Sequence, residues 1–169
     1  MKTKFLSIII ISFFSLSITA QTNVPFYEQI AFDYYKNEII EKSEEREKYK
    51  ITQNLKSIFY LSTECLKNKV YNEKEIKKLQ NSLYFKGYRL NLNKIDKKTF
   101  RKAKKINKNS NKENFVEVSI AYEFEGRIFV VISELTSGQG KDYIFEFNND
   151  GKIIDWCKSS EYTQMIFGL

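Results

Sequence analysis

The clearest pattern in the chain is the alternation of apolar and polar or small residues from Val116 to Phe124. A period of two residues predicts a β-strand with one face on a core and the other face in water. Glu125 and Gly126 follow, and Gly126 can adopt the positive φ that a tight hairpin turn needs. We therefore expect a strand and a hairpin turn here, with Val118 and Tyr122 on the same face.

The next run, Arg127 to Leu135, is apolar on both faces, which predicts a strand in the middle of a sheet. After a connection at 136–141, the alternation resumes, and Asn148-Asn149-Asp150-Gly151 predicts another turn because these residues tolerate left-handed backbone angles. A short last strand begins at Ile153. Together these signals predict an antiparallel meander from Phe115 to Trp156.

Helical spacing dominates the other end of the chain. Phe26, Ile30 and Tyr34 recur every four residues, and further apolar residues widen this stripe. Asn23 is a candidate N-cap, and Pro25 suits the first turn of a helix because no backbone donor is needed there. The pattern predicts an amphipathic helix whose apolar face is broad enough to lie across a sheet.

The middle of the chain is less decisive. The predicted helix ends near Lys42, where a segment dense in charges of both signs begins, and Tyr49 and Ile51 begin a strand. Residues 55–66 fit both a helix and a buried strand, and periodicity cannot decide for so short a run. The remaining spacing predicts short helices at 72–83 and 96–106, a strand at 88–92 and a polar loop at 107–114.

This order of elements predicts an α+β fold, with an N-terminal helix packed on a curved antiparallel β-sheet that ends in the C-terminal meander. The order resembles that of cystatin-like and NTF2-like domains. The resemblance rests on element order alone. It therefore implies an architecture and no functional residues.

The first 20 residues differ from the rest of the chain. Lys2 and Lys4 precede an apolar, serine-rich run from Phe5 to Ile18, and Ala20 offers a small residue for cleavage. This layout predicts a signal peptide at 1–20 and a single domain at 21–169. An uncleaved anchor is disfavoured, because the run has about 14 residues and roughly 20 are needed to span a bilayer.

We therefore expect a secreted or periplasmic protein with no transmembrane span after cleavage. In such a compartment Cys65 and Cys157, the only two cysteines, can form a disulfide. Alternatively, they are two separate buried thiols that act as small apolar side chains. Sequence cannot place their Cα atoms within bridging range, so both interpretations stay open.

The protein is basic, with a formal net charge of +7, and its positive charge is concentrated between Lys94 and Lys112. This run can attract polyanions such as an anionic envelope surface, but a solubilising surface is the favoured interpretation. Nucleic acid is a poor candidate, because an exported protein seldom meets it. The candidate polyanion-binding residues are Lys97, Lys98, Arg101 and Lys102.

Catalysis is limited by the absence of histidine, which excludes Ser–His and Cys–His nucleophile pairs and His-ligated zinc. Gly138-Gln139-Gly140-Lys141 departs from the P-loop pattern, and the 148–151 turn lacks the downstream oxygen ligands of a calcium loop. We assign no catalytic residue, metal or cofactor. The carboxylates that could form a glycosidase pair are Glu123, Glu134, Glu146 and Asp155.

Aromatic residues are abundant, with 11 tyrosines and 14 phenylalanines. Those on an open sheet face would bind a sugar, a lipid or a protein. The candidates are Tyr122, Phe129, Tyr143, Phe145 and Trp156. The shortage of catalytic groups favours a binding module for a protein partner or a small apolar ligand, and the alternative is a carboxylate-dependent hydrolase of envelope glycans.

Overall fold

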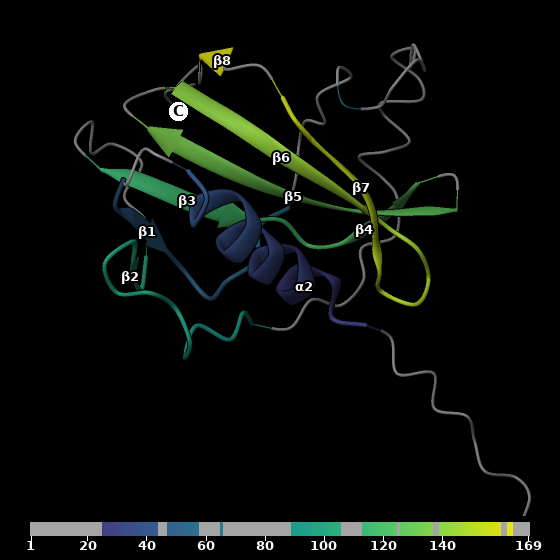
Figure 1. Cartoon of the computed structure of the whole chain (residues 1–169), viewed down its shortest axis with the longest axis horizontal. Coiled ribbons are helices and arrows are strands. Elements are labelled where there is room, and N and C mark those ends of the chain that lie inside the picture. Colours follow the sequence, from purple (N-terminus) through teal and green to yellow (C-terminus); the bar gives the residue numbers. More distant parts are fainter. Residues whose placement is uncertain are drawn as a thin grey trace, which may run out of the picture.

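The computed structural model describes residues 25–43, 47–57, 65, 89–105, 113–124, 126–136, 139–159 and 162–163. They form an α+β fold in which one helical segment lies across a mixed, open sheet (Figure 1). The segment is α-helical in α2 (Tyr27–Tyr34) and π-helical in η1 (Tyr35–Ile40). The predicted leader, the helix at 72–83 and most of 55–66 lie outside the described residues.

The described strands pair in the order β2-β1-β3-β5-β6-β7, with β4 on β5 and β8 on β6. They are β1 (Tyr49–Ile51), β2 (Phe100–Lys102), β3 (Asn114–Val118), β4 (Tyr122–Phe124), β5 (Arg127–Thr136), β6 (Gln139–Phe147), β7 (Ile153–Lys158) and β8 (Tyr162–Thr163). The predicted antiparallel meander is confirmed in β3, β5, β6 and β7.

The edge beyond β3 differs from the prediction of an antiparallel sheet. Strand β1 pairs parallel with both β2 and β3. Parallel neighbours require a long crossover between them, and the chain between Ile51 and Asn114 provides one. Because a sequence pattern shows that a strand exists but not its direction, the parallel edge could not be predicted.

A bulge divides the strand predicted at 116–124 into β3 and β4. Val118 pairs with Ile132 and Tyr122 pairs with Phe129, so three residues on one strand face two on the other. The extra residue turns Tyr122 to the face opposite Val118. The prediction that both lie on one face was therefore wrong. Ser119 holds the bulge, because its Oγ accepts a hydrogen bond from the Val131 amide (2.8 Å).

The two predicted turns are confirmed. Gly126 joins β4 to β5 with φ 74°, and Gly151 completes the turn before β7 with φ 81°. In that turn Asn148 Oδ1 accepts hydrogen bonds from the amides of Asp150 (3.1 Å) and Lys152 (2.8 Å). Strand β5 is buried on both faces as expected.

The helix starts later than predicted. Its N-cap is Phe26, without a side-chain hydrogen bond, so neither the Asn23 cap nor Pro25 in the first turn is correct. The deepest stripe is Tyr27, Ala31, Phe32 and Tyr35, whereas Phe26, Ile30 and Tyr34 are only partly buried at its margin. The apolar face was predicted, but its centre lies one position further along the chain.

The helix predicted at 96–106 is absent over its described part. Asp96 does cap a turn, because its Oδ1 accepts from the Lys98 amide (3.0 Å) and its Oδ2 from the Thr99 hydroxyl (2.8 Å). Phe100 then enters β2 and pairs with Tyr49 of β1. The strand predicted at 88–92 is irregular over 89–92, although Leu90 and Leu92 are buried. Tertiary pairing thus overrides a weak local pattern.

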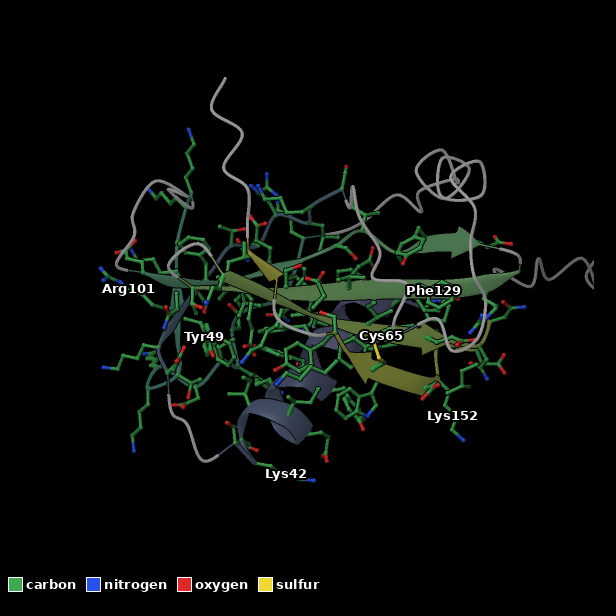
Figure 2. The ribbon with its side chains drawn as sticks, turned by 90° about the horizontal axis from the view of Figure 1, so that it is seen from above. Lys42, Tyr49, Cys65, Arg101, Phe129 and Lys152 are labelled. Carbon is green, nitrogen blue, oxygen red and sulfur yellow. A yellow bond between two sulfur atoms is a disulfide. The ribbon has the colours of Figure 1, made fainter. Side chains whose placement is uncertain are left out.

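The face of the sheet away from the helix is also buried. Phe129, Val131 and Ile144 lie there with at most 4% of their surface exposed. Cys157 is on the same face and forms a disulfide with Cys65, with the Cα atoms 5.4 Å apart (Figure 2). Of the two alternatives for the cysteines, the structure therefore has the disulfide and not two separate thiols. Among the described residues, no helix is long and apolar enough to cross a membrane.

Candidate binding groove beside the π-helical turn

The five candidate aromatic residues do not form one site. Tyr143 and Phe145 lie under the helix and are at most 4% exposed. Tyr122 and Phe129 stack on the opposite face with ring centroids 5.6 Å apart. Trp156 is 39% exposed at the β7 edge, where it contacts Phe145 (6.4 Å between ring centroids). Four of the five therefore serve the core, and the sheet offers no open aromatic platform among them.

Two of the four candidate carboxylates, Glu146 and Asp155, are cross-strand neighbours, and the other two lie elsewhere. Glu123 is exposed on β4, whereas Glu134 is buried beneath the helix. Glu146 lies on the opposite face, where it pairs with Asp155 of β7 and Arg127 binds both of its oxygens. A cation therefore neutralises Glu146, and the structure places no second carboxylate from this set beside Glu134.

Glu134 instead anchors the π-helical turn. The Tyr35 hydroxyl, at the first position of η1, donates to Glu134 Oε1 (2.6 Å). Lys141 Nζ lies 2.7 Å from Glu134 Oε2, and the Tyr49 hydroxyl donates to the same oxygen at 3.5 Å. The Glu134 side chain is 1% exposed, so this ion pair and these hydrogen bonds replace the water it has lost.

The tyrosines of this cluster stay protonated. Burial raises the pKa of Tyr35 well above its usual range, and the neighbouring Glu134 carboxylate raises it further. Burial also raises the pKa of Tyr49, and the Glu134 carboxylate raises it further. Both hydroxyls are therefore permanent donors to Glu134, and neither can act as a base near neutral pH.

The π-helical turn forms one wall of a surface groove. The groove has a volume of about 410 Å³ and lies between η1 and the turn that leads into β2. Its apolar lining is Ile40, Ile95 and Phe100, of which the two isoleucines are half-buried and Phe100 is buried. The polar lining consists of Lys36, Asn37, Glu41, Lys94, Asp96 and Thr99.

Several charges along the groove are already engaged. Lys36 forms an ion pair with Asp33 at 3.1 Å. Asp96 is bound within its own turn, and the hydrogen bond from the Lys98 amide is the main cause that lowers its pKa. Lys94 and Glu41 form no ion pair with the described residues. These two groups are the charges most available to a ligand.

The candidate polyanion-binding residues flank this groove. Lys97 and Lys98 lie in the turn capped by Asp96, and Arg101 and Lys102 lie in β2. All four are exposed, and they lie in a turn and a strand, whereas the sequence predicted a helix. Figure 2 shows Arg101 far from Lys152, which precedes β7. The four cations lie within six consecutive residues, at the turn before β2 and in β2 itself.

The groove residues on η1 were missed by the sequence analysis. Ile40 lies within the predicted first helix but was given no role, and Phe100 was expected in a second short helix. The available signal was the basic run beginning at Lys94, which marked this region as unusual. Nothing in the pattern indicated that a widened helical turn would face it.

The described part of the chain contains no group of three or more histidine, cysteine, aspartate or glutamate side chains that could hold a metal ion. No family model matches the sequence, and neither curated proteins nor solved structures give a significant match. The function of the groove is therefore inferred from its lining residues and from the hydrogen bonds of the Glu134 cluster.

Proposed function

We propose that the protein is a non-catalytic binding module that takes up a small, largely apolar ligand in the groove beside η1. The groove volume of about 410 Å³ carries this proposal. Ligand sites usually enclose about 300–1,000 Å³ and combine an apolar lining with a few polar groups. Ile40, Ile95 and Phe100 supply the apolar lining here, and Lys94 and Glu41 supply polar groups.

The π-helical wall supports the same proposal. A π-helical turn is rare and is frequently found at functional sites. Here the Glu41 amide donates to the Lys36 carbonyl oxygen (3.1 Å), which closes the wide turn. The buried Tyr35–Glu134 hydrogen bond holds its first residue. The groove wall is thus a defined backbone geometry.

We also propose that the protein works in an oxidising compartment, either a periplasm or outside the cell. The signal-like pattern at 1–20 motivates this proposal, and the Cys65–Cys157 disulfide supports it because such bonds persist under oxidising conditions. The exposed Lys97, Lys98, Arg101 and Lys102 would then meet an anionic envelope surface. A protein partner in that compartment is the alternative occupant of the groove.

The alternative of a carboxylate-dependent hydrolase gains no support from the placement of its candidate residues. Such an enzyme needs one protonated carboxylic acid beside one carboxylate. Lys141 binds Glu134, and Arg127 binds Glu146, which is the cross-strand neighbour of Asp155, so these two of the four candidates are held in ion pairs. We therefore develop the binding function alone.

The test is a titration with a neutral apolar fluorophore, N-phenyl-1-naphthylamine, against the full-length protein with its disulfide intact. We expect saturable binding that Ile95→Asp weakens about tenfold, because a charge would enter the apolar lining. The control is Ile154→Asp, since Ile154 is 56% exposed on β7, at the opposite edge of the sheet. Asn37→Trp, which changes an exposed rim residue, provides a second variant that leaves the core intact.

Equal binding by the Ile95 and Ile154 variants, with both folded by thermal denaturation, would place the fluorophore outside the groove and refute the proposal. Absence of saturable binding by the unmodified protein would refute it as well. Displacement of bound fluorophore by one purified envelope protein would assign the groove to a protein partner.

A further inference from the structure

The densest positive charge in the described chain lies directly beside the groove. Residues 94–105 contain seven cationic side chains and one acidic one, and all eight are exposed. The cations are Lys94, Lys97, Lys98, Arg101, Lys102, Lys104 and Lys105. None of them forms an ion pair with another described residue.

The single acid of this segment does little to offset these charges. Asp96 directs both carboxylate oxygens into its own turn, toward the Lys98 amide and the Thr99 hydroxyl. Glu41, on the opposite wall of the groove, is a single negative charge that forms no ion pair with another described residue. Charges separated by less than about 8–10 Å are only partly screened at physiological salt. The groove therefore has a positive rim on the side of Lys94.

We propose that the ligand of the groove is an anionic amphiphile, a single aliphatic chain that ends in a carboxylate or phosphate. The chain would lie on Ile40, Ile95 and Phe100, and the anionic head would contact Lys94. This inference rests on the proposed binding function and names its ligand class. The apolar lining supplies affinity through burial of the chain, and the cationic rim selects the sign of the head group.

The shape of the site favours a free molecule over a membrane surface. Ile40 and Ile95 are half-buried and Phe100 is 2% exposed, so these residues are recessed and cannot enter a bilayer. The exposed apolar residues that could insert, Ile154 and Trp156, lie on β7 at the other edge of the sheet (Figure 1). Insertion of Ile154 and Trp156 into a bilayer and attraction of the cationic segment to its head groups would thus act at opposite edges of the sheet.

The experiment compares three probes of equal chain length, namely octanoate, octanol and octylammonium, by isothermal titration against the full-length protein. We expect octanoate to bind about tenfold more tightly than octanol and octylammonium to bind most weakly. The advantage of octanoate should shrink in high salt, because screening weakens the contact with its head group. Each of these results supports an anionic ligand.

Lys94→Glu should weaken octanoate binding at least about tenfold and leave octanol binding within about twofold. Lys152→Glu makes the same charge change at an exposed position outside the groove and serves as its control. If both variants weaken octanoate binding equally, net charge is the cause and the role of Lys94 is refuted. The variant proteins are compared only after matching thermal denaturation profiles.

The outcomes separate this inference from the proposed function. Binding of octanoate and octanol with equal affinity and no salt dependence would overturn the anionic ligand and leave the binding module standing. Failure of every probe to bind would overturn both. Binding to vesicles of anionic phospholipid without binding to octanoate, with a blue shift of the single tryptophan, Trp156, would overturn the free ligand in favour of a membrane.

Discussion

The two ends of the helical segment are held in different ways. At the start of α2, the Tyr27 hydroxyl donates to the Asn149 carbonyl oxygen (3.1 Å). The next residue, Glu28, accepts a hydrogen bond at Oε1 from the Ala121 amide (2.9 Å). Both partners are main-chain groups, one in the turn before β7 and one in the bulge between β3 and β4. This end of the helix is tied to the backbone of the sheet.

The π-helical end is held by side chains. Tyr35 donates to Glu134, and Lys141 balances the Glu134 charge. The Lys141 side chain is 24% exposed, whereas Glu134 is 1% exposed. We call the end with main-chain partners the fixed end and the end with side-chain partners the adjustable end. The groove lies at the adjustable end.

The largest expected effect is at the adjustable end. Glu134→Ala should lower the free energy of unfolding by about 3 kcal/mol, because it leaves the Tyr35 hydroxyl and Lys141 without their buried partner. Urea denaturation measures the change. Glu134→Gln is the matched control, since it keeps an acceptor for Tyr35. It should lower the free energy of unfolding by less than Glu134→Ala does. A loss below about 1 kcal/mol for Glu134→Ala would show that the cluster does not anchor η1.

The next effect tests the fixed end. Gly151 has φ +81°, and a Cβ placed on it would lie 2.5 Å from Pro25 Cβ. Gly151→Ala should therefore cost about 2 kcal/mol or more, from backbone strain together with displacement of the chain that enters α2. Gly126→Ala is the control, because Gly126 has φ +74° with no atom within 4 Å of the added Cβ. Equal losses in the two variants, compared by urea denaturation, would show that the Pro25 contact does not hold the helix start.

The same contrast shows what the sequence could predict. The meander and its turns were predictable because the apolar run of β5 and the glycine signals at Gly126 and Gly151 are local. The bulge was not predictable, because Ser119 and Ala121 continue the alternation that the extra residue interrupts. The parallel edge depends on pairing between Tyr49 and Phe100, which are far apart in sequence.

The candidate site was predicted only in part. The basic run was visible, and its described cations, between Lys94 and Lys105, lie in β2 and in the turns on either side of it. One wall of the groove is the π-helical turn, whose first residue, Tyr35, donates a buried hydrogen bond to Glu134, 99 positions away in the sequence. The sequence pattern did not indicate that Glu134 is buried, since a glutamate in a strand normally faces water. A buried carboxylate is recognised only when its partners are known.

The smallest effect concerns Glu28 and depends on pH. Burial raises the pKa of Glu28, and the hydrogen bond from the Ala121 amide offsets this only in part. A carboxyl group whose folded-state pKa is raised contributes stability that is present below the unfolded pKa and is lost as pH rises through the folded pKa. Glu28→Gln keeps the acceptor for Ala121 and removes the titrating group.

The stability of Glu28→Gln relative to the unmodified protein should therefore increase from about pH 4 to about pH 7, as the carboxyl group of the unmodified protein loses its proton. Urea denaturation at several pH values measures this difference. Glu38→Gln is the control on the same helical segment, because Glu38 is exposed and pairs with Lys42 at 2.5 Å. A difference for Glu28→Gln that stays constant over this pH range would show that the pKa of Glu28 is the same in the folded and unfolded chains. The hydrogen bond from the Ala121 amide would then offset the effect of burial on the carboxylate in full, and the fixed end would not depend on pH through Glu28.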